Sequence, residues 1–192
     1  MRKIFLFAAA LLTVGFANAQ LSTSVGYLNT IVNDWDETYS AHGFNVELDY
    51  SYNLAGNLDV SSGLGMDMAF YKYNKNDSVF RDTFFDFSIP IDLSYGFQLN
   101  SNLKLDIFAG PTFMIGIKHI ITGNGDYLEE YYDDSNYPLK RFNVLLGGGV
   151  SLDIKDKYLI KLGYKKGLLD LDKTGDLPFK KDYLTIAVGY IF

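Results

Sequence analysis

The sequence feature that most limits the possible folds is a strict alternation of apolar with small or polar residues, clearest in segment 182–192. One face of this segment carries Leu184, Ile186, Val188, Tyr190 and Phe192. The residues between them are mostly small. Because the side chains of a β-strand point alternately to its two faces, the segment is predicted to be a strand with one apolar face. We expect pairing with the first strand to hold it, since unpaired ends fray.

The same alternation recurs in seven earlier segments, at residues 22–29, 43–53, 58–73, 83–98, 103–118, 140–154 and 158–167. The turns after the second, fourth and sixth segments are short, whereas the other connections are longer. This asymmetry is typical of outer-membrane barrels. The sequence therefore predicts an all-β fold, an eight-stranded antiparallel transmembrane up-and-down β-barrel. Pro90 lies within one segment and has no backbone N–H group, so a local irregularity or bulge is expected there.

The first nineteen residues have the features of an export signal. Arg2 and Lys3 precede an apolar run at residues 4–17, and Ala17-Asn18-Ala19 fits the small-x-small pattern of a cleavage site. The run is shorter than the roughly 20 residues of a spanning helix, which disfavours the alternative of an amino-terminal membrane anchor. We expect residues 1–19 to be a cleaved signal peptide and residues 20–192 to form one barrel domain in the outer membrane of a Gram-negative bacterium.

Alternation alone does not show which face meets lipid. An exported soluble β-sandwich or a lipocalin-like barrel has the same pattern with its apolar side inward. Aromatic residues gather at the strand ends that are expected to face the periplasm, as in an interfacial girdle: Tyr50, Tyr52, Tyr95, Phe97, Tyr158, Tyr190 and Phe192. The polar face is rich in glycine, which suits the narrow interior of an eight-stranded barrel. We therefore expect the apolar face to contact outer-membrane lipid.

Particular segments of the chain resemble a known family. They are Phe108-Ala-Gly-Pro-Thr112, Leu146-Gly-Gly-Gly-Val150, the signal that ends before Gln20 and the terminal aromatic alternation. Together they resemble the small outer-membrane β-barrel domain family of the PorT-like type, over nearly the whole mature chain. The resemblance implies no shared catalytic residues and an accessory role in a secretion or surface-assembly complex. The terminal apolar series also resembles the signal that the barrel-assembly machinery recognises.

The polar face of the predicted barrel carries more acids than bases. The expected lumen charge network consists of Glu47, Asp49, Asp67, Asp86, Asp92, Asp106, Lys118, Arg141, Lys161 and Lys165, with Asp59, Asp153 and Lys104 beside them. Unpaired charges are costly in so confined a space, so we expect acids of the second to fifth strands to pair with bases of the fifth to seventh. The preferred hypothesis is a polar filling of the barrel. The alternative is a narrow passive pore that prefers cations.

The longest predicted loop, residues 121–138, is rich in acids and tyrosines. Its candidate interaction residues are Asp126, Tyr127, Glu129, Glu130, Tyr131, Tyr132, Asp133 and Asp134. Clustered carboxylates bind hard cations, and exposed tyrosines suit contacts with proteins or glycans. The acids show no ordered ligand spacing, so no metal is assigned. We expect a solvated extracellular loop, with adhesion or partner binding as the alternative.

No set of catalytic residues is evident in the sequence. His119 is expected in the lipid-facing phase near the extracellular rim, where a lipid A-modifying enzyme would hold a base, but no hydroxyl nucleophile follows two residues later. The net charge of −6 argues against a nucleic-acid partner, and the absence of cysteine excludes disulfides and thiolate metal sites. We expect a non-catalytic protein without a cofactor, in a structural, surface-interaction or secretion-accessory role.

Overall fold

The computed structural model describes residues 19–34, 37–75, 78–123, 126–130, 139–173 and 178–192. The strands are β1 (Ala19–Asp34), β2 (Glu37–Ala55), β3 (Leu58–Lys75), β4 (Ser78–Asn100), β5 (Leu103–Gly123), β6 (Asp126–Glu130), β7 (Phe142–Ile154), β8 (Tyr158–Gly167) and β9 (Phe179–Ile191). In this part of the chain, no helix is long and apolar enough to cross a membrane. Residues 1–18 lie outside the described ranges, so the signal peptide stays a prediction.

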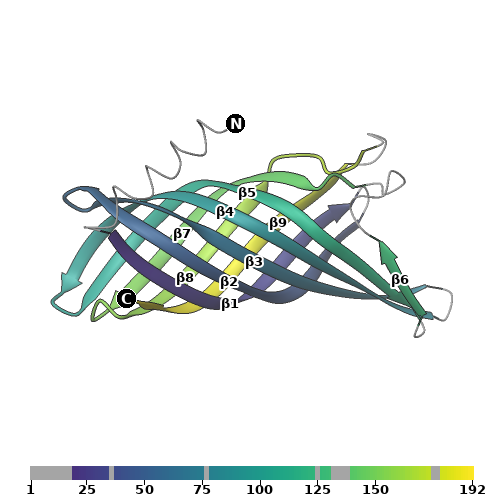
Figure 1. The fold of residues 1–192 in the computed structure, drawn as a ribbon, viewed down its shortest axis with the longest axis horizontal. Helices are drawn as coiled ribbons and strands as arrows, with labels where there is room; N and C mark the ends of the chain where they lie inside the picture. Colours follow the sequence, from purple (N-terminus) through teal and green to yellow (C-terminus); the bar gives the residue numbers. More distant parts are fainter. Residues whose placement is uncertain (1–18, 35–36, 76–77, 124–125, 131–138, 174–177) are drawn as a thin grey trace, which may run out of the picture.

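Eight of these strands close into a ring. Their order is β4-β3-β2-β1-β9-β8-β7-β5, and β4 pairs back onto β5 (Figure 1). The seam between β1 and β9 runs from Ser22 opposite Ile191 to Asp34 opposite Phe179. Every pairing in the ring is antiparallel. The eight-stranded up-and-down barrel and the closure of its last strand onto its first are therefore confirmed.

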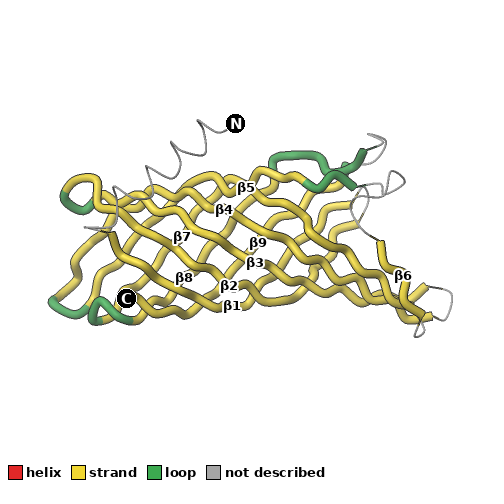
Figure 2. The backbone as a smooth tube through the Cα atoms, viewed as in Figure 1, coloured by secondary structure: helices red, strands yellow, loops and turns green. Residues whose placement is uncertain are grey.

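The two ends of the barrel differ. The short turns β2–β3, β4–β5 and β7–β8 lie at the end where the chain terminates, to the left in Figure 2. In the β7–β8 turn, Lys155 and Asp156 both have positive φ, of 56° and 50°. Two such central residues make a turn whose twist matches that of the flanking strands. Because outer-membrane barrels place their short turns in the periplasm, we call this end periplasmic and the opposite end extracellular.

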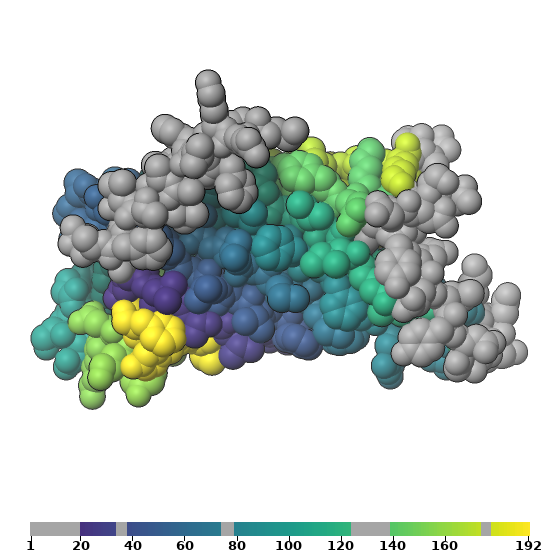
Figure 3. All heavy atoms as spheres, in the orientation of Figure 1, coloured from purple at the N-terminus to yellow at the C-terminus, as the bar shows by residue number. Residues whose placement is uncertain are grey.

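Apolar side chains cover most of the outside of the barrel, whereas the inside is filled by small, polar and charged side chains with two clusters of apolar ones among them. Met66 is 59% exposed on the outer face of β3, whereas Ala69 on its inner face is 3% exposed. The outward residues of the ring strands follow this alternation over most of their length, and Figure 3 shows one side of the wall that they form. The terminal series behaves in the same way, with Ile186, Val188, Tyr190 and Phe192 exposed. Its use as an assembly signal stays a prediction.

The connections expected after the first and third segments, residues 30–42 and 74–82, are mostly strand. β1 and β2 remain paired as far as Asp34 opposite Glu37, and β3 and β4 as far as Lys75 opposite Ser78. The expectation of long connections here was wrong, because backbone N–H and C=O groups continue to pair beyond the apolar band whatever the side chains. β6 was missed for the same reason. Its sequence Asp-Tyr-Leu-Glu-Glu has no apolar face, yet it pairs with the extracellular end of β5.

Pro90 interrupts the ladder without shifting it. The β3–β4 pairing passes from Ser62 opposite Ile91 to Gly65 opposite Ser88 in unchanged register. The hydroxyl of Ser62 donates to the carbonyl of Pro90 at 2.9 Å. The expected irregularity is thus a gap in the ladder, and the nearby bulge lies instead at Phe85/Asp86.

The wall of the barrel divides at the extracellular end. The β2–β3 pairing stops at His42 opposite Phe70, although β2 begins at Glu37 and β3 continues to Lys75. Beyond this point, β2, β1 and β9 form one sheet, and β3 to β6 form another (Figure 1, right). The edges 37–41 of β2 and 71–75 of β3 are therefore unpaired with each other.

The outward orientation of the apolar face predicts the effect of a charge at mid-wall. Met66→Arg should destabilise the barrel by about 2–4 kcal/mol, because the guanidinium would meet lipid near the bilayer centre. Leu99→Arg, beside the exposed β4–β5 turn, should cost only about 0–1 kcal/mol. Urea unfolding of both variants in lipid vesicles measures the difference. Equal costs at the two positions would contradict the assigned faces.

Candidate functional site: the barrel interior

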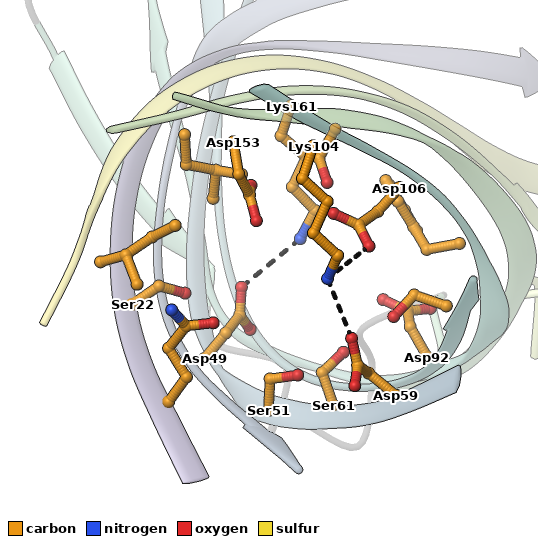
Figure 4. A pocket seen from close by; sticks show the side chains of 16 residues that line it. Ser22, Asp49, Ser51, Asp59, Ser61, Asp92, Lys104, Asp106, Asp153 and Lys161 are labelled. Carbon is orange, nitrogen blue, oxygen red and sulfur yellow. Dashed lines mark hydrogen bonds and ion pairs between the residues drawn. The ribbon is translucent and has the colours of Figure 1, made fainter. Parts of the chain in front are cut away.

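The periplasmic half of the interior holds an open cavity of about 90 Å³. Its charged lining consists of Asp49, Asp59, Asp92, Asp106, Asp153, Lys104 and Lys161 (Figure 4). The Nζ atom of Lys104 lies 3.1 Å from Asp59 and 2.9 Å from Asp106. We call this cavity the periplasmic vestibule. Strands β2 to β5 supply its acids, except for Asp153 of β7.

Further inside, two lysines of β8 neutralise acids from across the barrel. Lys161 places Nζ 2.8 Å from Glu47 and 3.4 Å from Asp49. Lys165 lies 3.4 Å from Asp92 and donates to the hydroxyl of Thr112 at 2.6 Å. These contacts have the pattern expected from the sequence, with bases of a late strand among acids of earlier strands. Because all of these side chains are largely buried, each lysine offsets a cost of desolvation that the carboxylates would otherwise carry alone.

The glycine-rich segment of β7 makes room for an aromatic ring in the lumen. Phe108 is 6% exposed, and a Cβ atom added to Gly149 would lie 2.7 Å from its ring. Lys161 Nζ lies 5.2 Å from the centre of the same ring. A side chain at position 149 would therefore collide with Phe108 as well as with the carbonyl oxygen of Leu162, and the Gly149–Phe108 contact links two of the segments on which the family resemblance rests.

An apolar layer closes the lumen above these charges. It consists of Leu28, Ala41, Ala69, Met114, Leu145 and Tyr183, with Tyr71 packed against it. We call it the inner apolar layer. A cavity of about 30 Å³ separates it from Glu47, Lys161 and Lys165. Leu28 and Leu145 are each only 1% exposed, so both side chains are packed on all sides.

A polar layer that the sequence did not predict lies next toward the extracellular end. Lys181 is 2% exposed, with Nζ 3.9 Å from Asp86 and 3.9 Å from the centre of the Phe84 ring. The Tyr183 hydroxyl donates to Asp86 at 3.5 Å. Lys181 was missed because the last strand was taken to begin at residue 182. It has the same phase as Tyr183 and Ala187, which was the available signal.

The bulge in the β4–β5 pairing corrects two expectations. Asp86 lies opposite Gly116, but Phe85 lies opposite Lys118, so β5 carries one extra residue here. Lys118 therefore shares the outward face of Phe85 rather than the lumen. His119 turns inward instead, stacks on Phe84 at 4.3 Å and approaches Asp82 at 3.8 Å. The lipid-facing placement of His119 was wrong.

A second apolar layer lies at the extracellular end, formed by Val32, Leu171 and Phe179 with Tyr39 and Leu139. We call it the outer apolar layer. Asp170 holds the β8–β9 connection in place, because its carboxylate accepts hydrogen bonds of 3.0 Å from the backbone N–H groups of Phe179 and Asp172. These two donors lower the pKa of Asp170 from its usual value. Arg141, expected in the lumen, is exposed at this rim and donates to the carbonyl of Gly116.

The remaining candidates are placed as follows. Asp67 lies between Asn45 and Asp86 across neighbouring strands and lines the small cavity beside Glu47 and Ser88. Of the candidate loop residues, Asp126, Tyr127, Glu129 and Glu130 belong to β6, of which only the backbone is described. Tyr131, Tyr132, Asp133 and Asp134 lie outside the described residues. Among the described residues, no group of three His, Asp or Glu side chains is placed to hold a metal ion.

With this geometry established, comparison with known proteins gives the family. Residues 7–173 match the outer membrane protein beta-barrel domain. The chain belongs to this family. Membership and fold together place it in the outer membrane. No curated protein matches the sequence.

Solved structures with the same fold are distant in sequence. Ail, the attachment invasion locus protein of Yersinia pestis, solved with the heparin analogue sucrose octasulfate, is 16% identical with a TM-score of 0.56. That alignment covers 91% of this chain and 99% of Ail. Neisserial surface protein A is 15% identical with a TM-score of 0.52, covering 90% of this chain and 97% of that protein. At this level of identity, the similarity shows the fold.

The buried contacts of Lys161 predict a large loss of stability when its charge is removed. Lys161→Met should destabilise the barrel by about 3–5 kcal/mol, because Glu47 and Asp49 would be left buried beside each other without this base. Urea unfolding in vesicles measures the loss. Adding Glu47→Gln should restore part of the stability, whereas Lys157→Met in the exposed turn should change it by less than about 0.5 kcal/mol. Wild-type stability for Lys161→Met would show that water, rather than Lys161, stabilises these carboxylates.

Proposed function

We propose that the protein is a non-catalytic barrel with a closed interior that acts through its extracellular surface. The observation that carries this proposal is the pair of apolar layers across the lumen. Leu28 and Ala41 of the inner layer and Val32 of the outer layer are almost completely buried. The barrel has charged groups on both sides of the inner apolar layer, and the buried apolar side chains between them disfavour the alternative of a passive cation pore.

Planar-bilayer recordings test the closed interior. The wild-type protein should show no conductance steps, because ions would have to cross both apolar layers. Leu145→Ala combined with Phe179→Ala removes bulk from each layer and should allow a small cation leak. Leu146→Ala, at the neighbouring outward position, is the matched control and should remain silent. Steady cation-selective steps from the wild-type barrel would establish the pore instead.

The positions of the histidines support a non-catalytic role. His119 is 5% exposed beneath the outer apolar layer, so a lipid at the outer surface does not reach its ring. His42 is exposed, and the Tyr27 hydroxyl lies 2.6 Å from its Nδ1 atom. A tyrosine–histidine contact orients the two rings on the outer wall. It does not supply the hydroxyl nucleophile and acid of a lipid A-modifying hydrolase.

The divided wall gives the extracellular end a means of binding a partner. Unpaired strand edges can accept an added strand from another chain, and the β2 and β3 edges are of this kind. Four aromatic rings form a continuous stack in this region. Tyr39 stacks on Tyr71 at 4.1 Å, Tyr71 on Tyr73, and Tyr73 on Phe80. Ail is described as an attachment protein. By analogy we propose a surface role for this chain, and we do not assign it the ligand of Ail.

The PorT-like resemblance implies a different role, as an accessory protein of a secretion or surface-assembly complex. In that role we expect the barrel to contact its partner through the periplasmic end. Single cysteines separate these roles, because the chain contains no cysteine of its own. Thr38→Cys on the β2 edge, carrying a photo-crosslinker, should give a discrete adduct on intact cells, whereas Leu54→Cys near the periplasmic β2–β3 turn should not. Adducts from Leu54→Cys alone would favour the accessory role and contradict our proposal.

A further inference from the structure

Charges on the outer wall are distributed very differently from those of the whole chain. The chain has a net charge of −6, but the outward positions of the described strands carry several bases near the extracellular end: Lys72, Arg81, Lys118, Lys166 and Lys180. Among outward side chains that the structure describes, the one carboxylate is Asp182. It is 7% exposed and already accepts hydrogen bonds from the Tyr164 hydroxyl at 2.9 Å and from the Gly167 N–H group at 3.0 Å.

Two of these bases face each other directly. Lys72 of β3 lies opposite Arg81 of β4, and both side chains are exposed. Neither forms an ion pair with a described residue. Like charges directly opposite each other on one face of a sheet are destabilising. An anion held between the two side chains would remove this repulsion.

The depth of the pair on the wall indicates where that anion lies. On β3, the outward residues from Val60 to Phe70 are apolar except for Ser62, which is bonded to Pro90. Ten steps of about 3.3 Å at a tilt of about 40° span roughly 25 Å, the height of the lipid-facing band of an outer-membrane barrel. Lys72 is the next outward residue. It therefore lies just beyond the acyl region, at the level of the lipid headgroups.

We propose that Lys72 and Arg81 bind the phosphate group of an anionic lipid headgroup in the outer leaflet, one whose negative charge no cation of the same headgroup offsets, unlike the phosphate of phosphatidylcholine. A guanidinium can donate two parallel hydrogen bonds to phosphate oxygens, and the ammonium group adds a mobile point charge. The acyl chains of the same lipid would pack on the half-buried Met68, Phe70 and Phe85 below. This apolar surface directly beneath the cations fits a lipid rather than a free phosphate ion.

The test compares Lys72→Gln/Arg81→Gln with a matched control, Lys155→Gln/Lys157→Gln, which removes two charges at the exposed periplasmic turn. Full-length proteins are placed in nanodiscs of phosphatidylcholine alone or with phosphatidate as a minor component. Thermal unfolding and native mass spectrometry then report stability and retained phosphatidate. We expect phosphatidate to raise the melting temperature of the wild type and of the control. Retention should fall by roughly fivefold for each cation removed at the site.

The sign of the effect in phosphatidylcholine separates this site from a purely structural role. There, Lys72→Gln/Arg81→Gln should be at least as stable as the wild type, because the like-charge repulsion is gone. With phosphatidate, the order should reverse. A variant less stable in both lipids, or an equal phosphatidate effect for all three proteins, would overturn the proposal. If inorganic phosphate in phosphatidylcholine discs raised stability as much as phosphatidate, the ligand would be a free anion and the lipid assignment would fail.

Discussion

Closure of the backbone hydrogen-bond ladder between β1 and β9 is the constraint on which the rest of the structure depends. In lipid, an unpaired N–H or C=O group has no water to bind, so a spanning sheet must have no free edge. The continuous pairing from Ser22–Ile191 to Asp34–Phe179 removes that edge. Closing the ring with eight strands also fixes a narrow interior. Small side chains and compact layers inside the barrel follow from that width, as the contact between Gly149 and Phe108 shows.

The narrow interior explains why acidic side chains lie mostly on the inner face of the barrel, whereas the charged side chains of the outer face are mostly basic. Acids on the inner face can be stabilised by lysines a few ångströms away across the lumen, as Lys161 does for Glu47 and Asp49. On the outer wall no such partner can be supplied from across a cavity, and acids are nearly absent among the described side chains. Basic side chains on the outer wall become less costly beyond the acyl region, because anionic headgroups are available there. The acidic interior and the basic extracellular rim are thus two solutions to the same problem of desolvation.

Where the environment is lipid, the sequence predicted the structure well. All eight spanning strands and their outward faces followed from apolar alternation, because a polar residue on the lipid side carries a large cost. Beyond the lipid that cost vanishes, so the apolar alternation that predicts a strand is also lost. For this reason the strand ends near Asp34 and Lys75 and the whole of β6 were predicted to be loops. The bulge opposite Phe85 was also invisible, because Ile117, Ile120 and Ile121 flank Lys118 and His119 and allow either phase. That one extra residue exchanged the faces of the lysine and the histidine.

The same strand brings together the two surface features of the extracellular end. β3 pairs with β4 as far as Lys75, while its opposite edge loses β2 after Phe70. Lys72 is therefore next to Arg81 on the paired side and next to an open edge on the other. A phosphate bound by Lys72 and Arg81 would link β3 to β4 at the membrane surface, on the face of the sheet opposite the Tyr71–Tyr73–Phe80 stack. Tyr39 is the one described aromatic ring that stacks across the division, on Tyr71 at 4.1 Å. A partner strand added to the β3 edge would have to displace or extend this stack. The position of the β3–β6 sheet, which the bound lipid would hold at the membrane surface, relative to β2 would therefore decide whether the β3 edge is accessible.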